Sequence, residues 1–257
     1  MAVIALLTDF GTRDYFVGAM KGAILSINPR ARIVDITHEI EPQNIGSANF
    51  TLRACYADFP SKTIFVAVVD PGVGSERRAI LVTGGEYFFI APDNGLLSFV
   101  FNESTDFRVF ELTDQKFFAE NISRSFHGRD IFAPVAAHLS KGVKAAEFGA
   151  EIKDFVRLAE NKPRKINVSE IEAEIIAIDR FGNLVTNLRR ADLPEKFLIE
   201  IGAARIENLR SYFAEGAAGE AFMIFGSAGF LEISVFGDSA KNLLQAQIGQ
   251  QILVKSR

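Results

Sequence analysis

Two unbroken apolar runs, each ended by a polar loop with an aspartate, constrain the fold of this chain more than any other feature. Asp9 comes two residues after the first run, 3–7, and Asp70 directly follows the second run, 64–69. Such runs predict strands that are buried on both faces, as in a parallel sheet with helices on each side. Ligands of these sheets bind beyond the carboxyl ends of the strands, so we expect Asp9 and Asp70 to share one crevice.

Helical and strand-like patterns alternate through the first part of the chain, as expected for an α/β domain. Gly84-Gly85 separates two short apolar runs and indicates a hairpin. Pro134 limits the last helical pattern. We expect helices at 15–27, 45–59 and 129–139, strands at 3–7, 33–36 and 64–69, and a hairpin of 79–83 with 87–90.

The pattern changes at the polar stretch 161–165, which contains a proline. Beyond it, short strand-like runs at 173–179, 197–201, 221–225 and 231–235 are separated by glycine-containing turns. This spacing is typical of a small β domain such as a barrel. We predict an N-terminal α/β domain over 1–160, a linker over 161–168 and a C-terminal β-barrel domain over 169–257.

Charge and cysteine content exclude several classes of protein. The formal net charge is −4 and the pI about 5.5, which argues against binding to nucleic acid. Cys55 is the only cysteine, so neither an intrachain disulfide nor a cysteine zinc site is expected. No apolar run reaches the length of a membrane span, and the N-terminal run is too short for a signal peptide. We therefore expect a cytoplasmic protein that does not bind membranes.

Four glycine-containing polar loops are candidates for chemistry: 8–12, 69–74, 91–95 and 125–130. Each loop also has a structural interpretation. Asp9 is placed to cap the following helix, Asp70 and Asp93 lie in turn sequences, and His127 lies near a helix start. Several such loops in one chain favour a site.

A metallohydrolase is one alternative that these loops suggest. The possible ligands are His38, Asp9, Asp70, Asp93, His127 and Asp130. However, the chain has only three histidines and no His-Glu-x-x-His pair, so we expect no metal. Phosphate-loop and Gly-x-Ser-x-Gly patterns are also absent from the sequence.

At these loops the sequence resembles the S-adenosyl-L-methionine (SAM) hydrolase (adenosine-forming), or SAM hydroxide adenosyltransferase, family, whose relatives include fluorinase and chlorinase. The resemblance spans nearly the full length. It is carried by TDFGTRDYFVGAMKG (8–22), DITHEI (35–40), VVDPGVGSERR (68–78), IAPDNGLL (90–97), SFHGRDIFAP (125–134) and AIDRFGNLVTN (177–187).

This resemblance implies an N-terminal three-layer α/β domain with a central, mostly parallel sheet and a smaller C-terminal antiparallel β-barrel domain. It also implies hydrolysis of SAM to adenosine and L-methionine without a cofactor. The implied assembly is a homotrimer, with the substrate between the N-terminal domain of one subunit and the C-terminal domain of the next.

The resemblance also implies roles for single residues. Asp70, Arg77 and His127 match a water-handling triad, and Asp9 matches the aspartate that binds the ribose hydroxyls. Further substrate contacts are implied for the residues flanking His127 (Phe126 and Gly128), for the methionine amine (Asp179), for the adenine (Phe181, Asn183 and Phe213) and for the carboxylate (Ser227).

Elementary chemistry agrees with these roles. The sulfonium leaves as a neutral thioether, so no acid is needed at sulfur, and the task is to hold and deprotonate a water behind ribose C5′. Positioning alone can supply about 7–11 kcal/mol. We hypothesise that Asp70 and His127 orient and deprotonate this water while Arg77 keeps Asp70 ionised.

Two alternatives remain open at this point. The halogenating relatives carry tyrosine at the position of Asp70 and lack Arg77 and His127, so a halogenase is disfavoured because an ionised aspartate repels an anion. A sensor of SAM or adenosine with little turnover is the second alternative. Arginine follows the serine in the halogenating relatives, but Ala228 follows Ser227 here, which weakens carboxylate recognition.

Overall fold

The computed structural model describes residues 2–257, and these divide into two compact units. Unit 1 ends at Glu160 and unit 2 begins at Asn161. Each unit has its own core and is described separately below. Among residues 2–257, no helix is both long and apolar enough to cross a membrane.

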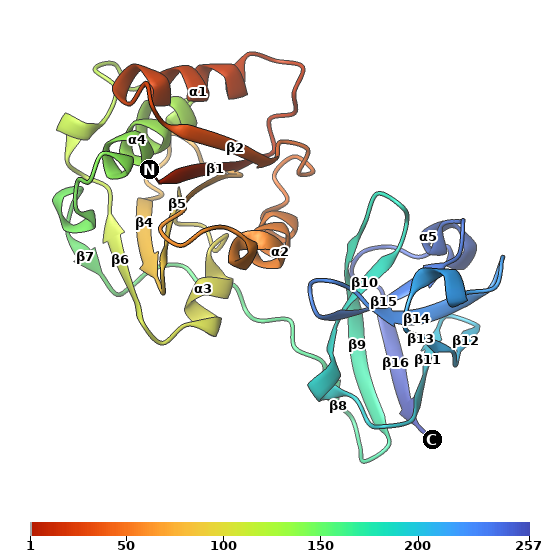
Figure 1. Cartoon of the computed structure of the whole chain (residues 1–257). Helices are drawn as coiled ribbons and strands as arrows, with labels where there is room; N and C mark the ends of the chain where they lie inside the picture. The colour runs from red at the N-terminus through yellow and green to blue at the C-terminus, as the bar shows by residue number, and fades with distance from the viewer. Residues whose placement is uncertain (1) are drawn as a thin grey trace. The chain divides into compact units, whose positions relative to one another are not determined.

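A seven-stranded sheet in the order β2-β1-β3-β5-β4-β6-β7 forms the centre of unit 1 (Figure 1). The pairings among β2, β1, β3 and β5 are parallel, and β4, β6 and β7 continue the sheet antiparallel. The prediction of a mostly parallel sheet therefore holds for the part that carries Asp9 and Asp70. The strands are β1 (Val3–Thr8), β2 (Arg32–Thr37), β3 (Ile64–Val68), β4 (Ala79–Gly84), β5 (Tyr87–Pro92), β6 (Phe107–Glu111) and β7 (Glu151–Ile152).

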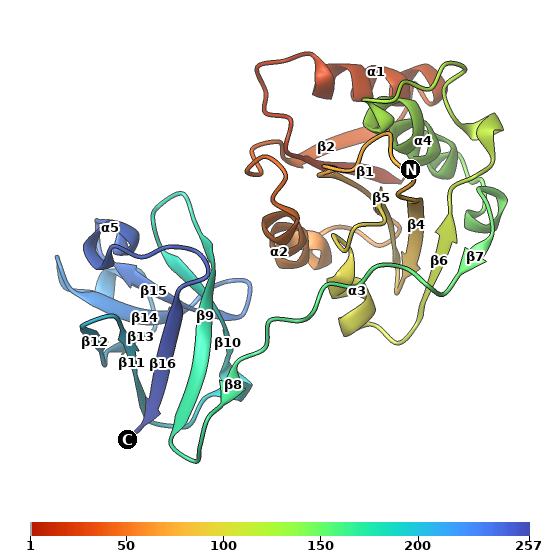
Figure 2. The same cartoon turned by 180° about the vertical axis from the view of Figure 1, so that it is seen from behind.

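Helices cover both faces of this sheet, which confirms the three-layer α/β architecture (Figures 1 and 2). Alternate residues of β1 point to opposite faces, with Ile4 and Leu6 in one core and Ala5 and Leu7 in the other. The first core contains α1 (Phe16–Ile27) and α4 (Ala133–Ser140), and the second contains α2 (Ile45–Cys55) and α3 (Ser98–Glu103).

Two of the predicted helices differ from the sequence prediction at one end. The α-helix predicted to end at residue 59 ends at Cys55, and a 3₁₀ turn (Tyr56–Asp58) completes the segment. The helix predicted from residue 129 begins as a π-helical turn (Gly128–Phe132). Pro134 then lies in the first turn of α4, directly after this π-helical turn. Shorter 3₁₀ turns occur at Gln115–Phe117 and Ala145–Glu147.

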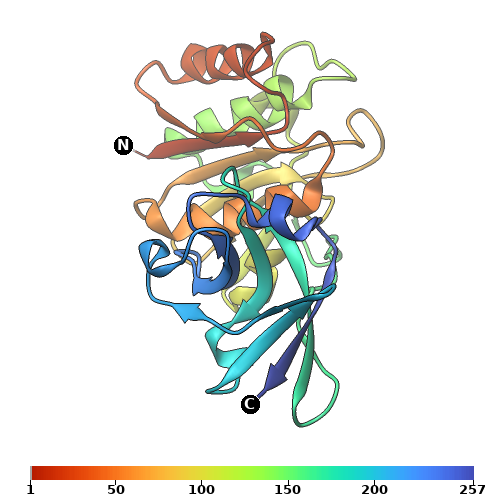
Figure 3. The ribbon, with the colours of Figure 1, turned by 90° about the vertical axis from the view of Figure 1, so that its right-hand side faces the viewer.

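Unit 2 is a curled β-sheet that forms a half-barrel (Figure 3). Its strand order is β12-β11-β16-β9-β10-β15-β14-β13, with β8 also paired to β9, and only β13 and β14 pair in parallel. The strands are β8 (Arg164–Lys165), β9 (Glu170–Ile178), β10 (Leu184–Arg189), β11 (Phe197–Ile201), β12 (Ala204–Ile206), β13 (Leu209–Arg210), β14 (Ala221–Phe225), β15 (Phe230–Val235) and β16 (Gln251–Ser256). The helical pieces are a short helix, α5 (Ala240–Leu244), and 3₁₀ turns at Arg190–Asp192 and Phe213–Glu215.

The polar segment between the units is irregular only in part. Residues 154–163 have no regular secondary structure. Even so, two backbone N–H groups at the start of this segment donate to side chains in the body of unit 1. Val156 N donates to Asp93 Oδ1 (2.8 Å) and Leu158 N donates to Ser98 Oγ (2.8 Å). Arg164–Lys165, within the stretch interpreted as a linker, forms β8 against β9.

Candidate active site

Asp9 and Asp70 follow the carboxyl ends of two neighbouring strands of the sheet. β1 and β3 are neighbouring parallel strands, and Thr8 lies opposite Val68 at their carboxyl ends. Asp9 does not cap α1, whose N-cap is Tyr15 without a side-chain hydrogen bond. Instead Asp9 Oδ2 accepts from Gln43 N (2.8 Å), and no hydrogen bond joins Oδ1 to another described residue. This carboxylate therefore keeps acceptor sites for a ligand.

Arg77 holds Asp70 with two parallel hydrogen bonds. Nε donates to Oδ1 (2.9 Å) and Nη2 donates to Oδ2. The two side chains are nearly buried, with 11% of Arg77 and 6% of Asp70 exposed. Ser75 shapes the loop between them, since its Oγ donates to Gly72 O (2.7 Å) and accepts from Arg77 N (3.2 Å). The loop thus fixes a bidentate, weakly hydrated ion pair.

The same arginine also contacts His127. Nη2 lies 2.8 Å from His127 Nδ1. A guanidinium only donates hydrogen bonds, so Nδ1 accepts and the ring proton of neutral His127 is on Nε2. Burial lowers the pKa of His127, the charge of Arg77 lowers it further, and Asp70 and Asp130 oppose this shift. His127 is therefore neutral at pH 7.

A close backbone approach brings the Asp70 loop and the His127 loop together. Gly74 has a positive φ of 77°, and a Cβ there would lie 2.1 Å from Arg124 O. Only glycine allows both the conformation and the contact. No sequence pattern indicates this contact, because it depends on two loops that are distant in the chain.

Phe126 and Gly128, the neighbours of His127, are packed against the core of unit 1. The Phe126 ring is edge-on to Phe10 and Phe16, with centroids 5.8 and 5.2 Å apart. A Cβ on Gly128 would lie 3.2 Å from both Met20 Sδ and Phe126 Cε2. The backbone around His127 thus packs against aromatic rings of the unit 1 core.

In unit 2, Asp179 organises the turn between β9 and β10. Its Oδ1 accepts from Phe181 N (2.9 Å) and Asn183 N (2.8 Å), and its Oδ2 accepts from Asn183 Nδ2 (2.7 Å). Phe181 does not pack into the core of unit 2, and Asn183 does not take a positive φ. Phe181 is 77% exposed, and Gly182 takes the positive φ of 84°.

Phe213 and Ser227, the two unit 2 candidates outside this turn, are not joined to it by any hydrogen bond between described residues. Asp179 and Phe181 line a hollow of about 580 Å³, whereas Asn183, Phe213 and Ser227 do not. Ser227 lies in the β14–β15 turn, and Phe213 packs edge-on to Phe222 (6.3 Å).

Glu232 on β15 is an acidic residue that the sequence analysis missed. Its side chain crowds Gly226, the residue before Ser227, where a Cβ would lie 1.7 Å from Glu232 Oε1. Burial and the charge of Asp179 raise the pKa of Glu232. Glu232 therefore lies close enough to Asp179 for their charges to interact, and only its place in the folded sheet reveals this.

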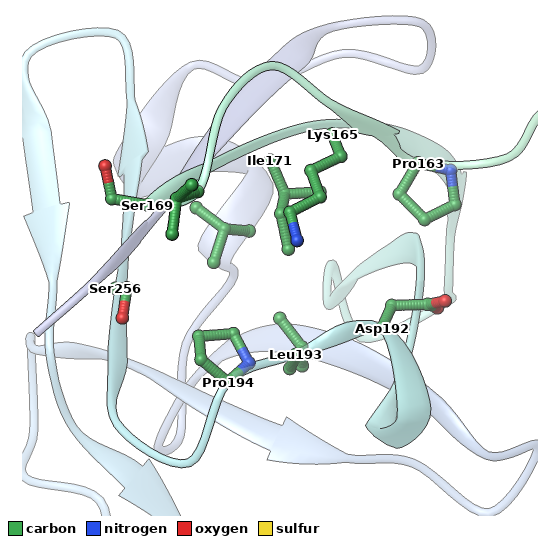
Figure 4. Close-up of a pocket in the computed structure, with 10 residues that line it drawn as sticks. Pro163, Lys165, Ser169, Ile171, Asp192, Leu193, Pro194 and Ser256 are labelled. Atoms are coloured by element: carbon green, nitrogen blue, oxygen red, sulfur yellow. The ribbon is translucent and has the colours of Figure 1, made fainter.

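A second hollow in unit 2, of about 330 Å³, contains none of the predicted residues (Figure 4). Its lining is largely apolar and comes from β8, β9, β16 and the segment before β11. Lys165 is the basic side chain in this lining. Asp192 is the acidic side chain in this lining and no histidine lies beside it, so the hollow is a poor candidate for the reaction.

The possible metal ligands have other partners. Asp93 Oδ2 accepts from Arg78 Nε (3.0 Å), and Asp130 Oδ1 accepts from Arg129 Nε (2.6 Å). His38 is 4% exposed, with Nδ1 2.9 Å from Thr8 Oγ1. Residues 2–257 contain no group of three or more His, Cys, Asp or Glu placed to hold a metal ion.

The chain is similar to known proteins over most of its length. The SAM hydroxide adenosyltransferase N-terminal domain matches residues 4–149, and the corresponding C-terminal domain matches 173–253. The chain is 36% identical to the (R)-S-adenosyl-L-methionine hydrolase of Methanocaldococcus jannaschii, over 97% of this chain and 94% of that protein. It is 30% identical to the fluorinase of an Actinoplanes species, over 74% and 73% of the two chains.

A solved structure extends the similarity to the whole fold. An uncharacterized conserved protein from Thermotoga maritima superposes with a TM-score of 0.92 at 36% identity, covering 98% of this chain and all of that one.

The Gly74 contact generates a stability prediction. Gly74→Ala forces a Cβ against Arg124 O in addition to an unfavourable φ, whereas Gly85→Ala has the unfavourable φ (56°) in open space. We expect Gly85→Ala to cost about 1–2 kcal/mol and Gly74→Ala to cost clearly more, measured by urea unfolding. Equal costs would contradict the role of the loop contact.

Arg77 generates a pH prediction. In Arg77→Met the guanidinium charge that opposes protonation is lost and Asp70 remains, so the pKa of His127 should rise. NMR titration of the histidine rings measures it, with the His127 signal assigned from its loss in His127→Asn. Arg78→Met, which removes an arginine that pairs with Asp93 instead, should leave this pKa unchanged. A pKa that stays or falls in Arg77→Met contradicts the assignment.

Proposed function

This chain belongs to the SAM hydroxide adenosyltransferase family, and from that premise we propose that it hydrolyses SAM to adenosine and L-methionine. The observation that carries the proposal is the bridge from Arg77 to Asp70 and His127 at the carboxyl edge of the sheet. The full-length similarity to hydrolases named for this reaction supports it.

The reaction is an in-line displacement at ribose C5′. The water oxygen forms a bond to C5′ while the C5′–S bond breaks. The electron pair of the C5′–S bond goes to sulfur, which leaves as the thioether of methionine. One proton of the water must pass to a base. Because the leaving group is neutral, the protein has to supply only position and a proton acceptor.

Asp70 is the better proton acceptor of the two candidates. His127 Nδ1 already accepts from Arg77, and a neutral imidazole has only this one acceptor nitrogen. The carboxylate of Asp70 has acceptor sites beyond the two that Arg77 occupies. In this proposal Asp70 takes the proton. His127 accepts from the Arg77 guanidinium and so keeps it oriented toward Asp70.

The remaining residues bind the three parts of SAM. Asp9 accepts from the ribose hydroxyls with its open oxygen. The exposed rings of Phe181 and Phe213 provide apolar walls for the purine.

Asn183 keeps Oδ1 for the adenine amino group, because its Nδ2 donates to Asp179. Asp179 faces the methionine ammonium. Ser227 and nearby backbone N–H groups receive the carboxylate, while Phe126 and Gly128 border the reacting carbon.

We also propose a homotrimer in which unit 1 of one subunit and unit 2 of the next complete each site. The division of labour supports this assembly, since unit 1 carries the water and ribose groups and unit 2 the adenine and methionine groups. Catalysis without metal or cofactor and a cytoplasmic location both stay predictions.

Product analysis by chromatography with mass detection tests the reaction. We expect adenosine and methionine in equal amounts, over many turnovers and unaffected by chloride. Release limited to one equivalent or none would favour the sensor, and a chlorinated nucleoside would favour the halogenase.

Variants separate the base from its support. Asp70→Asn should lower kcat by roughly 10²–10⁴-fold, the range for loss of a general base. His127→Asn, whose side-chain oxygen can still accept from Arg77, should retain more activity than His127→Ala. If His127→Asn and His127→Ala are as inactive as Asp70→Asn, the proton goes to His127 instead.

Complementation tests the shared site. Asp70→Asn and Phe181→Ala change different units, and Phe181 is 77% exposed, so neither change should prevent folding. Co-expressed subunits should form trimers in which about a quarter of the sites combine two unaltered units. Activity of the mixture above that of either variant supports the trimer site. No gain, or a monomer by light scattering, contradicts it.

A further inference from the structure

Asp130 is a buried carboxylate three residues after His127 that the proposed reaction does not use. It is 1% exposed. Its Oδ2 accepts from Ser123 N (2.8 Å), Ser123 Oγ (2.7 Å) and Arg129 Nη2 (3.1 Å), and Oδ1 accepts from Arg129 Nε (2.6 Å). Burial raises the pKa of Asp130, but the hydrogen bonds from Arg129 and Ser123 outweigh burial and lower it. The carboxylate is therefore ionised at neutral pH.

These contacts tie both ends of the segment that leads to His127. Ser123 Oγ, which donates to Asp130, also accepts from Phe126 N (3.1 Å). The backbone of Asp130 donates to Phe126 O (3.1 Å) and accepts from Ala119 N (2.8 Å). Segment 119–126 is thus closed onto Asp130 at its start, its middle and its end.

The local helix geometry makes this closure possible. His127 precedes the π-helical turn Gly128–Phe132, in which Ala133 N donates to Gly128 O. Such widened turns are rare and occur frequently at functional sites. Here the turn buries the carboxylate of Asp130 against Ser123 while the neighbouring Arg129 remains 40% exposed.

We propose that Asp130 is a positioning residue for the hydrolysis proposed above. Through Ser123 it fixes the loop that presents Phe126 and His127, and with its negative charge it offsets Arg77 at the His127 ring. The charged groups that act on the ring are Arg77 on one side and Asp70 and Asp130 on the other. The positioning role depends on the proposed function, whereas the electrostatic effect on His127 does not.

Asp130→Asn is the primary test, because it keeps the size of the side chain and removes the charge. The asparagine can still accept from Ser123 but cannot receive Arg129 as a charged pair. We expect kcat to fall roughly 10–100-fold, as for a small displacement of a reacting group, with KM changed less than about twofold. The NMR pKa of His127 should fall, and the acid limb of kcat/KM should move to lower pH.

Two further variants isolate the loop contact. Ser123→Ala removes the hydroxyl that joins Asp130 to Phe126 N, so kcat should fall without loss of the carboxylate. Ser123→Thr restores a hydroxyl at the same position and should recover most of the wild-type kcat.

Asp93→Asn is the matched control for a buried carboxylate. Asp93 also accepts from a backbone N–H, of Val156, and from an arginine, Arg78. We expect Asp93→Asn to lower Tm about as much as Asp130→Asn does, without changing the pKa of His127.

The outcomes are distinguishable. If Asp130→Asn lowers only Tm, with kcat and the His127 pKa as in wild type, Asp130 is merely structural and the inference is overturned. If wild-type protein releases no adenosine, the proposed function fails. The NMR titration then still decides whether the charge of Asp130 acts on His127, and an unchanged pKa overturns that part too.

Discussion

The candidate site depends on the hydrogen bonds that the guanidinium of Arg77 donates. The guanidinium binds both oxygens of Asp70 and Nδ1 of His127, so one donor group orients two other side chains and sets the tautomer of His127. Its surroundings hold it in place. Ser75 shapes its loop, and Phe132 lies beneath it with the ring centroid 5.4 Å from Cζ. A lysine could not replace it, because an ammonium lacks the planar fork.

Arg77 and His127 come from two loops that are far apart in the chain. The Asp70 loop follows β3 at the carboxyl edge of the sheet, and the His127 loop precedes the π-helical turn before α4. Gly74 lets the backbones of the two loops touch. The ion pair alone would not determine this arrangement, since an exposed arginine could bind a carboxylate in many rotamers. Burial of the Arg77 and Asp70 side chains, together with the contact between the two loops, selects one of them.

Much of this could be predicted from the sequence because the signals were local. Buried strands need continuous apolar runs, so β1 and β3 were predicted nearly to the residue, and their ends indicated Asp9 and Asp70. The π-helical turn at Gly128–Phe132 was not predictable, since its residues have ordinary helical propensities and tertiary contacts decide its width. For the same reason Asp130 was considered only as a possible metal ligand and Glu232 was missed: their partners are set by packing, not by spacing.

The candidates differ in how far sequence similarity and geometry agree. For Asp70, Arg77 and His127 the motif and the hydrogen bonds agree. For Asp179 and Asn183 the structure adds a reason for the motif, because each side chain holds the other in the turn. A residue that binds a ligand while it also supports its own loop cannot be exchanged freely. On the proposed function, this dual role of Asp179 and Asn183 explains why the short sequence Asp-Arg-Phe-Gly-Asn is a specific signal. Ser227 and Phe213 lack such partners among the described residues, and their roles rest on the resemblance alone.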